Sequence, residues 1–474
     1  MKGKTLEHRA RRQLSQSGLA DTLYRATQRA VDKRNATIED HAEWERRRDH
    51  ARQIKLHTLC RIDELLAQFI ERAQANGFVV HAALDAEEAR RIALRICRDH
   101  GVTRVIKGKS MVSEEIALNP ALEAAGIEVT ESDLGELIVQ LLGQAPAHIT
   151  APAIHLAVEE ILTLFRERLA YELPSELRFE GAAIPPRQRS AIARDLTLAA
   201  RRFLQRRFLR AQLGFSGANF LIADSGRLVL LENEANIRLS TTLPRVHVAI
   251  AGFDKLIPSH DDLATFLHLL PTSSTGQRLT SYVSEIGDGD GRHIILLDNG
   301  RSQLLADAEH YDLLSCIRCG ACSNVCPIFR NIGGHGYGGV YSGPIGAALL
   351  PHLGGIDAYG DLPFASSLCG ACSSICPVGI PIHERLLEWR ERAQRARGTS
   401  GEKLIARAFA WLIERPAWFA AAATTYPLAQ SFSRLLPVLR RWSSERDLPE
   451  MPRQTFLEWI ADEGRETQRR EEER

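Results

Sequence analysis

Seven of the nine cysteines fall into two short motifs between residues 316 and 376. The first motif reads Cys-Ile-Arg-Cys-Gly-Ala-Cys-Ser-Asn-Val-Cys-Pro over residues 316–327. This C-x2-C-x2-C-x3-C-P spacing is typical of bacterial-type ferredoxins, because three thiolates on one tight loop reach three corners of a cubane cluster. Zinc sites with four cysteines come instead from two separated C-x2-C pairs. The first motif therefore predicts an iron–sulfur cluster.

The second motif, at residues 366–377, repeats the first position for position, but serine stands in place of the first cysteine. In two-cluster ferredoxins the last cysteine of each motif binds the other cluster. We therefore expect one complete [4Fe–4S] site and one site with only three thiolates. The complete site comprises Cys316, Cys319, Cys322 and Cys376, and the incomplete site comprises Cys326, Cys369 and Cys372.

The missing thiolate leaves three alternatives for the second site. Ser366 or another oxygen donor binds the fourth iron, or this iron is open to solvent or to a small molecule, or it is absent and the cluster is [3Fe–4S]. The spacing of the residues does not choose among these alternatives. The sequence thus predicts two iron–sulfur clusters, of which at least one is [4Fe–4S] and the second is [4Fe–4S] or [3Fe–4S].

Several polar residues outside the motifs are weaker candidates for binding. Lys109 and Ser110 precede a predicted helix whose N-terminus would attract an anion, although plain helix capping is the favoured explanation. Residues 232–236 (Glu-Asn-Glu-Ala-Asn) follow a predicted strand, where ligand sites form in α/β domains, or they make a solvated loop. Residues 133–136 and 148–155 also lie at the ends of segments and are candidates for the same cleft.

Three ring-bearing residues between the motifs are candidates for contacts with a cluster, and two cysteines lie outside the motifs. His335, Tyr337 and Tyr341 lie between the two motifs and either donate hydrogen bonds to a cluster or simply pack. Cys60 and Cys97 lie in amphipathic helical stretches, so we expect both to be buried core thiols.

The composition is that of an ordinary globular protein. The chain has 474 residues, of which 44% are hydrophobic and 25% charged, and this length suggests two or three domains. The formal net charge of +1 gives no indication of a nucleic-acid partner. The first residues lack the apolar segment of a signal peptide, and no run of about 18 uncharged apolar residues is long enough to span a membrane. We therefore expect a cytoplasmic protein, whose closely spaced cysteines bind metal rather than form disulfides.

The elements that must position these residues follow from the hydrophobic pattern. Helical stretches alternate with short apolar runs, which predict strands near residues 78–81, 102–106, 127–130 and 246–251. Strands separated by helices predict an α/β domain with a mainly parallel sheet. Two β-hairpins are also expected, one over residues 217–231 with a Ser-Gly turn and one over residues 271–296 with a glycine-rich turn.

Four regions are expected along the chain. They are a helical N-terminal arm at 1–56, the α/β domain at 57–296, an α-helical, ferredoxin-like two-cluster module at 303–396 and a helical C-terminal region at 397–474.

Over nearly its whole length, the chain resembles the lactate utilization protein B family. Four segments are similar to the α/β (LUD) domain of that family: residues 108–116, 131–136, 148–155 and 233–236. Residues 316–381 resemble its ferredoxin-type module, and residues 452–459 resemble its C-terminal segment. One departure is Ala235, where the family usually has glycine.

The resemblance implies an iron–sulfur cluster-binding LUD-domain protein that takes part in oxidising L-lactate to pyruvate. It also implies two partners, lactate utilization proteins A and C, together with an unidentified electron acceptor. We therefore expect an iron–sulfur electron-transfer subunit of an oxidoreductase complex. Two alternatives stay open. One is a self-contained enzyme that uses an under-ligated cluster as a Lewis acid on an anionic substrate, and the other is a scaffold whose clusters are structural.

Overall fold

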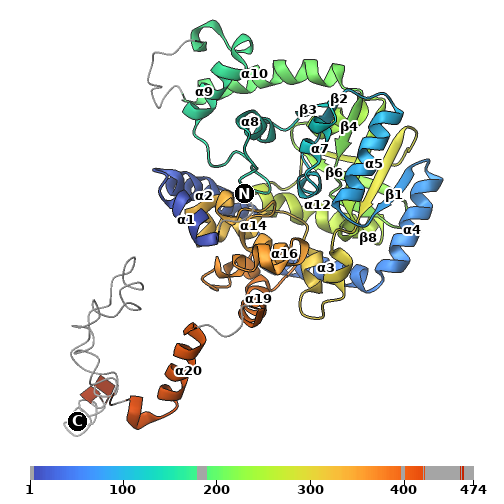
Figure 1. Cartoon of the computed structure of the whole chain (residues 1–474). Helices are drawn as coiled ribbons and strands as arrows, with labels where there is room; N and C mark the ends of the chain where they lie inside the picture. Colours follow the sequence, from blue (N-terminus) through green and yellow to red (C-terminus); the bar gives the residue numbers. More distant parts are fainter. Residues whose placement is uncertain are drawn as a thin grey trace. The chain divides into compact units, whose positions relative to one another are not determined.

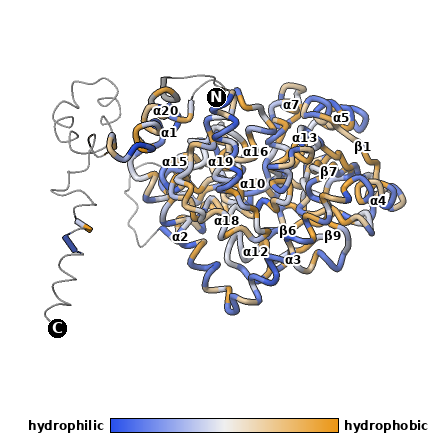
Figure 2. Tube along the Cα trace, turned by 90° about the horizontal axis from the view of Figure 1, so that it is seen from below, coloured by the Kyte–Doolittle hydropathy of each residue, from blue (hydrophilic) through white to orange (hydrophobic). Residues whose placement is uncertain are grey.

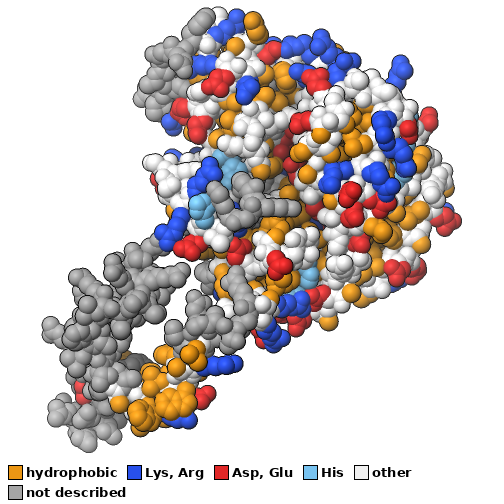
Figure 3. All heavy atoms as spheres, viewed as in Figure 1, with side chains coloured by type: hydrophobic (Ala, Val, Ile, Leu, Met, Phe, Trp, Pro, Cys, Tyr) orange, Lys and Arg blue, Asp and Glu red, His pale blue; other side chains and the backbone are white. Residues whose placement is uncertain are grey.

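The computed structural model describes residues 5–178, 189–396 and 401–419, together with residues 421, 459, 460, 462 and 463. Residues 1–393 form one compact unit, and residues 394–474 form another. Within the described part of the chain, no helix is long and apolar enough to cross a membrane. Figure 3 shows Lys and Arg side chains interspersed with Asp and Glu on the face in view, in keeping with the small net charge.

The N-terminal region is built from four helices: α1 (Leu6–Leu14), α2 (Leu19–Thr37), α3 (His41–Cys60) and α4 (Ile62–Ala75). Helix α3 begins after Asp40, whose carboxylate accepts hydrogen bonds from the backbone N–H groups of Ala42 and Glu43. Leu23 and Trp44 are buried, so these helices are amphipathic and contribute to the core. Figure 1 shows α1 and α2 beside α14 (Ala321–Val325) of the cysteine-rich region, against which α2 packs.

The main sheet is parallel, as the sequence predicts. Its six strands lie in the order β1 (Val79–Ala83), β10 (Arg292–Leu297), β7 (Val246–Gly252), β4 (Leu213–Ser216), β2 (Arg104–Lys107) and β3 (Glu128–Glu131). Helices α5 (Ala86–Asp99) and α7 (Leu118–Ala124) cover one face through residues such as Ile92 and Leu122. Helices α8 (Leu134–Leu142), α9 (Val158–Arg168) and α10 (Arg189–Arg210) enclose a separate core around Ile106.

A second sheet of four strands confirms one predicted hairpin and shows that the other is wrong. Its order is β8 (Leu256–Ile257), β5 (Phe220–Ile222), β6 (Arg227–Glu232) and β9 (Tyr282–Ile286), with β5 and β6 antiparallel as expected. Residues 260–275, however, are helix α12 (His260–Thr275), capped by Ser259. Strand β9 pairs with β6 while β10 joins the main sheet, so the glycine-rich segment links two sheets. Glycine is required there because a Cβ on Gly289 would lie 2.2 Å from the backbone nitrogen of Phe78.

The cysteine-rich region is mostly helical, as predicted. It contains α14, α15 (Pro327–Tyr337), α16 (Gly343–Leu353), α18 (Ala371–Ser374) and α19 (Ile382–Ala396). One hydrophobic core runs from Leu23 and Phe69 in the N-terminal helices through Phe220 of the second sheet to Phe329 and Leu386. Figure 2 shows hydrophilic and hydrophobic residues alternating along the helices, as expected for amphipathic elements around a core. In the second unit, the structure describes helix α20 (Gly401–Ile413), and most of the predicted helical region 397–474 lies outside the described residues.

Candidate metal centre and adjacent cavity

The first group of thiols combines cysteines from both motifs. Burial raises the pKa of Cys319, and the negative charges of Cys376 and Cys316 raise it further. Burial also raises the pKa of Cys322 well above its usual value, with added repulsion from Cys319 and Cys316. Cys376 belongs to the second motif, yet it is close enough to Cys316 and Cys319 of the first for their charges to interact. The assignment of Cys316, Cys319, Cys322 and Cys376 to one cluster stays a prediction.

The second group is formed in the same crossed manner. Burial raises the pKa of Cys372 to about 11, and the charges of Cys326 and Cys369 contribute to the shift. Cys369 is exposed, and a hydrogen bond from the backbone N–H of Ala371 lowers its pKa. This group therefore lies closer to solvent than the first. The assignment of these three cysteines to a second cluster also stays a prediction.

Backbone donors surround these thiols and test whether the site fits an iron–sulfur group. The N–H of Arg318 donates to Cys316 Sγ at 3.4 Å, and the N–H of Ile380 donates to Cys376 Sγ at 3.4 Å. Such donors stabilise the negative sulfur of a cluster. Buried thiolates crowded by like charges are unfavourable unless a cation compensates them, and a bound metal supplies that compensation. The donor set therefore fits iron–sulfur clusters.

The two cysteine loops share two left-handed backbone positions. Arg318 and Leu368, at equivalent positions, have left-handed φ angles of 60° and 56°, and Gly320 and Gly370 have φ angles of 76° and 78°. In the second loop the N–H of Leu368 donates to Ser366 Oγ at 3.0 Å, which repeats the contact of Arg318 with Cys316. Ser366 thus presents an oxygen where the first loop presents sulfur.

A cavity of about 280 Å³ adjoins the first cysteine loop at the carboxyl edge of the main sheet. Ligands bind at this edge in α/β folds because strand ends and loops leave a crevice there. The wall includes residues that follow four of the strands, together with two residues of the cysteine loop: Lys109 and Ser110 after β2, Asp133 after β3, Gly217 after β4, Asp254 and Lys255 after β7, and Ile317 and Arg318.

Cations dominate the wall beside the cysteine loop. Arg301 donates to Glu115 at 2.8 Å and to Asp254 at 2.6 Å. Arg318 donates to the other oxygen of Asp254 at 3.2 Å, so two guanidinium groups share this carboxylate. Lys255 is 8% exposed and forms no hydrogen bond or ion pair with any described residue. Burial lowers the pKa of Lys255 to about 8, with a further contribution from Arg318.

Three family matches follow the order of the regions along the chain. Residues 66–297 match the LUD domain, residues 312–380 match a 4Fe-4S dicluster domain, and residues 388–465 match the C-terminal domain of lactate utilisation protein B. Lactate utilization protein B of Bacillus subtilis (strain 168) is 39% identical, over 94% of this chain and 94% of its own length. The chain belongs to the lactate utilization protein B family.

Other relatives extend this family assignment. Proteins of the same name are 37% identical in Bacillus pumilus (strain SAFR-032), over 95% of this chain and 97% of the relative, and 38% identical in Macrococcus caseolyticus (strain JCSC5402), over 96% and 97%. A crystal structure of a DUF162 family protein from Deinococcus radiodurans is 13% identical and covers 50% of this chain and 96% of its own. Its TM-score of 0.26 is too low to support an argument about the fold. The dicluster match supports iron–sulfur clusters as cofactors of this lactate utilization protein B family member.

In this member of the family, Ser110 is a helix cap and Lys109 lines the cavity. Ser110 Oγ accepts the N–H of Ser113 at 3.3 Å at the start of α6 (Met111–Glu115). Because α6 is only five residues long, its N-terminus is not a separate anion site. Lys109 forms no hydrogen bond or ion pair with any described residue, and its ammonium group remains available to the cavity.

The loop at residues 232–236 lies on the cavity wall, and Glu234 is its one exposed residue. The carboxylate of Glu232 accepts the backbone N–H groups of Ile237 and Arg238 at 2.6 and 2.7 Å. Ala235, the departure from the family, has a φ of 58°, which glycine adopts more easily than alanine. The loop therefore keeps the left-handed conformation without the glycine.

Only one of the three residues predicted between the motifs lies against a motif cysteine. The hydroxyl of Tyr337 is 4.0 Å from Cys326 Sγ. Tyr341 donates to Glu115 at 2.6 Å and lines the cavity instead. His335 Nε2 lies 2.7 Å from the carbonyl oxygen of Ala145, which is a contact within the fold and not one with a cysteine.

The segment 148–155 only partly lines the predicted cleft. Ile149 and Thr150 are on the cavity wall, as is Asp133 of the neighbouring segment. His148 is buried, and its Nδ1 accepts the N–H of Thr150 at 3.1 Å, so its observed role is to hold the loop in shape. His155 lines a different cavity, beside the N-terminal helices.

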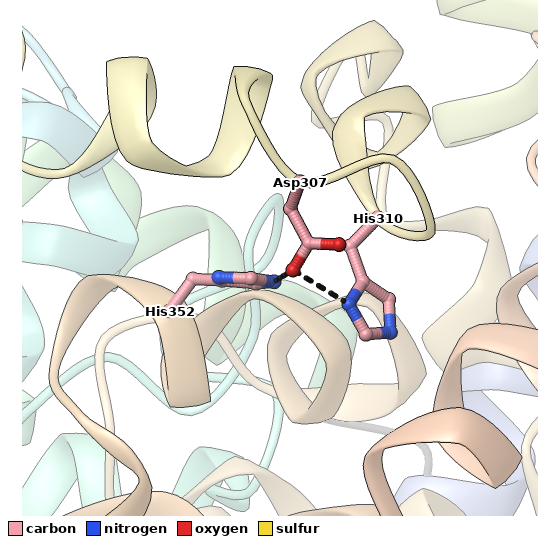
Figure 4. A group of neighbouring side chains, drawn as sticks. All are labelled: Asp307, His310 and His352. Carbon is pink, nitrogen blue, oxygen red and sulfur yellow. Dashed lines mark hydrogen bonds and ion pairs between the residues drawn. The ribbon is translucent and has the colours of Figure 1, made fainter. Parts of the chain in front are cut away.

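A group of three possible metal ligands lies away from the cysteines (Figure 4). Ligand atoms of Asp307, His310 and His352 are within 4.8 Å of one another. The Asp307 carboxylate, however, accepts a hydrogen bond from Arg392 at 2.9 Å, and His310 stacks on Trp389 with ring centroids 5.0 Å apart. Because a guanidinium already provides the positive charge at this carboxylate, we interpret the group as an ion-pair network that fastens α19 to the segment before the first cysteine loop.

Sequence reasoning identified Lys109 but missed the other cations of the cavity, and it misjudged one cysteine. Lys255 and Arg301 follow β7 and β10, so the rule that selected residues 232–236 would have found them had those strand ends been searched. Cys97 is buried as predicted, but Cys60 is exposed. The expectation for Cys60 is wrong because α3 ends there: Arg61 leaves the helical conformation (φ −118°, ψ 27°), so the apolar stripe does not continue into α4.

Proposed function

We propose that this chain is the iron–sulfur electron-transfer subunit of a complex that oxidises L-lactate to pyruvate. The observation that carries the proposal is that thiols of different motifs are close neighbours, Cys319 of Cys376 and Cys372 of Cys326. When bound, iron–sulfur clusters supply one-electron transfer. The name lactate utilization protein B, borne by relatives that match nearly the whole chain, supports lactate oxidation as the process.

Each group of residues has a distinct role in this proposal. Cys316, Cys319, Cys322 and Cys376 hold the first cluster, and backbone N–H groups stabilise its sulfur charge. Cys326, Cys369 and Cys372 hold the second cluster near the surface, because Cys369 is exposed to solvent and therefore to a redox partner. The partners that we propose are lactate utilization proteins A and C and an electron acceptor, all meeting this chain in the cytoplasm.

The position of the cavity favours the carrier over the self-contained enzyme. An enzyme that used an open iron as a Lewis acid would need its substrate beside the loop that lacks a thiolate. The cavity instead adjoins the first cysteine loop, which lacks no thiolate, and its wall includes Ile317 and Arg318 of that loop. This placement supports electron transfer without direct binding of substrate to iron.

The proposal is tested by mixing L-lactate anaerobically with this chain, alone and together with proteins A and C, and following cluster reduction by electron paramagnetic resonance. We expect dithionite to reduce the clusters reversibly in the isolated chain, and L-lactate to reduce them only in the mixture. Clusters that dithionite does not reduce would point to the scaffold. Reduction by lactate in the isolated chain would point to the self-contained enzyme.

A further inference from the structure

We propose that the cavity at the carboxyl edge of the main sheet binds a small carboxylate anion beside the first cysteine loop. The anion site stands on the charges and size of the cavity, whereas the choice of a 2-hydroxy acid such as L-lactate as its ligand rests on the proposed function.

Two ammonium groups on the cavity wall have no partner among the described residues. Lys109 and Lys255 both line the cavity, and neither forms a hydrogen bond or an ion pair there. Lys255 is 92% removed from solvent, since its exposed fraction is 8%. A buried ammonium without a partner is unfavourable unless an anion compensates it. Nearby carboxylates offset part of this charge, but neither ammonium group has a direct anionic partner among the described residues.

The carboxylates of the wall are mostly committed elsewhere. Asp254 is shared by two guanidinium groups, and Glu232 accepts two backbone N–H groups at the start of α11 (Asn236–Thr242). Asp133 Oδ1 caps α8 by accepting the N–H of Glu136 at 2.9 Å. The remaining one, Glu234, is exposed. Asp133 and Glu234 attract Lys109, and Asp254 attracts Lys255, but none of these carboxylates forms an ion pair with either lysine. A small anion in the cavity would be the first direct partner of both ammonium groups.

The size and lining of the cavity restrict the anion. Its volume of about 280 Å³ is below the range of roughly 300–1,000 Å³ that is typical of pockets for drug-sized ligands. Ile149, Leu230, Ile237 and Ile317 provide apolar wall, which suits a short alkyl group attached to the charged end. A small carboxylate fits both properties better than inorganic phosphate, which has no apolar part.

The anion would lie beside the loop that holds the first cluster. The side chain of Arg318 lines the cavity, while its backbone N–H donates to Cys316 Sγ at 3.4 Å. The unpaired lysines have one other explanation, which is that they only balance the negative charge of the bound cluster. That explanation predicts no saturable binding of an anion, so a binding measurement separates the two.

The test is calorimetric titration of L-lactate, pyruvate, propionate and inorganic phosphate into the anaerobically purified full chain with its clusters. We expect saturable binding of L-lactate that is about tenfold weaker or more in Lys255→Met and in Lys109→Met, because each loses a charged contact. Lys33→Met is the matched control, since Lys33 is exposed and is not part of the cavity wall, and it should bind as the wild type does.

Removing an unpartnered buried charge should leave the thermal midpoint unchanged or raise it, which shows that any loss of binding is not due to unfolding. The proposal would be overturned if lactate did not bind saturably, or if both lysine variants bound lactate as tightly as the wild type. Equal affinity of the wild type for phosphate and lactate would also overturn it. Dithionite reduction of the clusters is measured in the same samples. Reducible clusters without anion binding contradict this inference alone, whereas clusters that cannot be reduced contradict the proposed function.

Discussion

The two cysteine loops differ in their surroundings and hardly at all in their backbone. Both place a non-glycine residue and then a glycine in the left-handed region, at Arg318 and Gly320 in one and at Leu368 and Gly370 in the other. A Cβ on Gly320 would lie 3.0 Å from His148, whereas a Cβ on Gly370 would meet nothing within 4 Å. The same loop is thus enclosed in one place and open in the other. Chemical inequivalence of two clusters can therefore arise from one missing thiolate and from exposure, without a change of loop geometry.

The largest difference between the loops should appear when a cysteine of the enclosed loop is removed. Cys319→Ala should lose the first cluster, because that site has no spare thiolate, and the cysteine-rich region should lose much of its stability with it. Iron analysis should show a loss of about four irons per chain, from the stoichiometry of a cubane cluster. Cys60→Ala is the control, since Cys60 is exposed and outside both motifs, and should retain all iron. Retention of both clusters in Cys319→Ala would contradict the assignment of Cys319 as a ligand of the first cluster.

The open loop should carry the cluster that oxidation damages first. Mild oxidation should convert the second cluster to a [3Fe–4S] form with its own paramagnetic signal, because a serine hydroxyl is a weaker iron ligand than a thiolate. Ser366→Cys should suppress this conversion, since Ser366 Oγ already accepts the N–H of Leu368 in the way that Cys316 Sγ accepts that of Arg318. Two clusters of equal resistance in the wild type would show that another residue completes the site.

A smaller effect should separate the reduction potentials of the two clusters. Arg318→Gln removes a buried positive charge beside Cys316, so the first cluster should become harder to reduce by tens of millivolts. The matched change Leu368→Gln at the equivalent position of the second loop removes no charge. Redox titration followed by electron paramagnetic resonance should therefore show a shift of the first potential in Arg318→Gln and little shift of either potential in Leu368→Gln. A shift of only the second potential would reverse the assignment of the loops.

The smallest expected effect concerns the ion pair that fastens α19 near both loops. Hydrogen bonds from Arg392 hold the pKa of Asp307 below its usual range. A carboxyl whose pKa is lowered in the folded state stabilises the protein fully above its unfolded pKa of about 4. This contribution is lost progressively as the pH falls from about 4 through the lower pKa of the folded state. Asp307→Asn should cost about 1–2 kcal/mol at pH 7 and progressively less below pH 4. Thermal midpoints of both proteins across this pH range measure the difference, and a gap that persists at low pH would contradict the ion-pair explanation.

The parallel sheet and the iron–sulfur clusters could be predicted from the sequence because both predictions depend on local patterns. The strands near Val105 and Val248 are short apolar runs between helices, and cysteine spacing is fixed by cluster geometry. Prediction failed at residues 271–296, where a hairpin was expected. The glycine-rich segment there passes from one sheet to the other, and Gly289 lies against the backbone of Phe78, far away in the chain.

The cavity could not be assembled from the sequence for a similar reason. Arg301 and Glu115 are 186 residues apart, and Arg318 and Asp254 are 64 residues apart. No local pattern distinguishes these charged residues from solvated ones. Lys109 was selected through its position before a helix, and the structure places it on the cavity wall.

A redox titration of the anaerobically purified full chain, followed by electron paramagnetic resonance, tests the central claim most directly. We predict two reversible cluster signals from a brown protein with roughly seven to eight irons per chain, one signal resistant to oxidation and one convertible to a [3Fe–4S] form. A colourless protein that binds zinc, or iron without any reducible signal, would contradict the assignment of this chain as a two-cluster electron carrier.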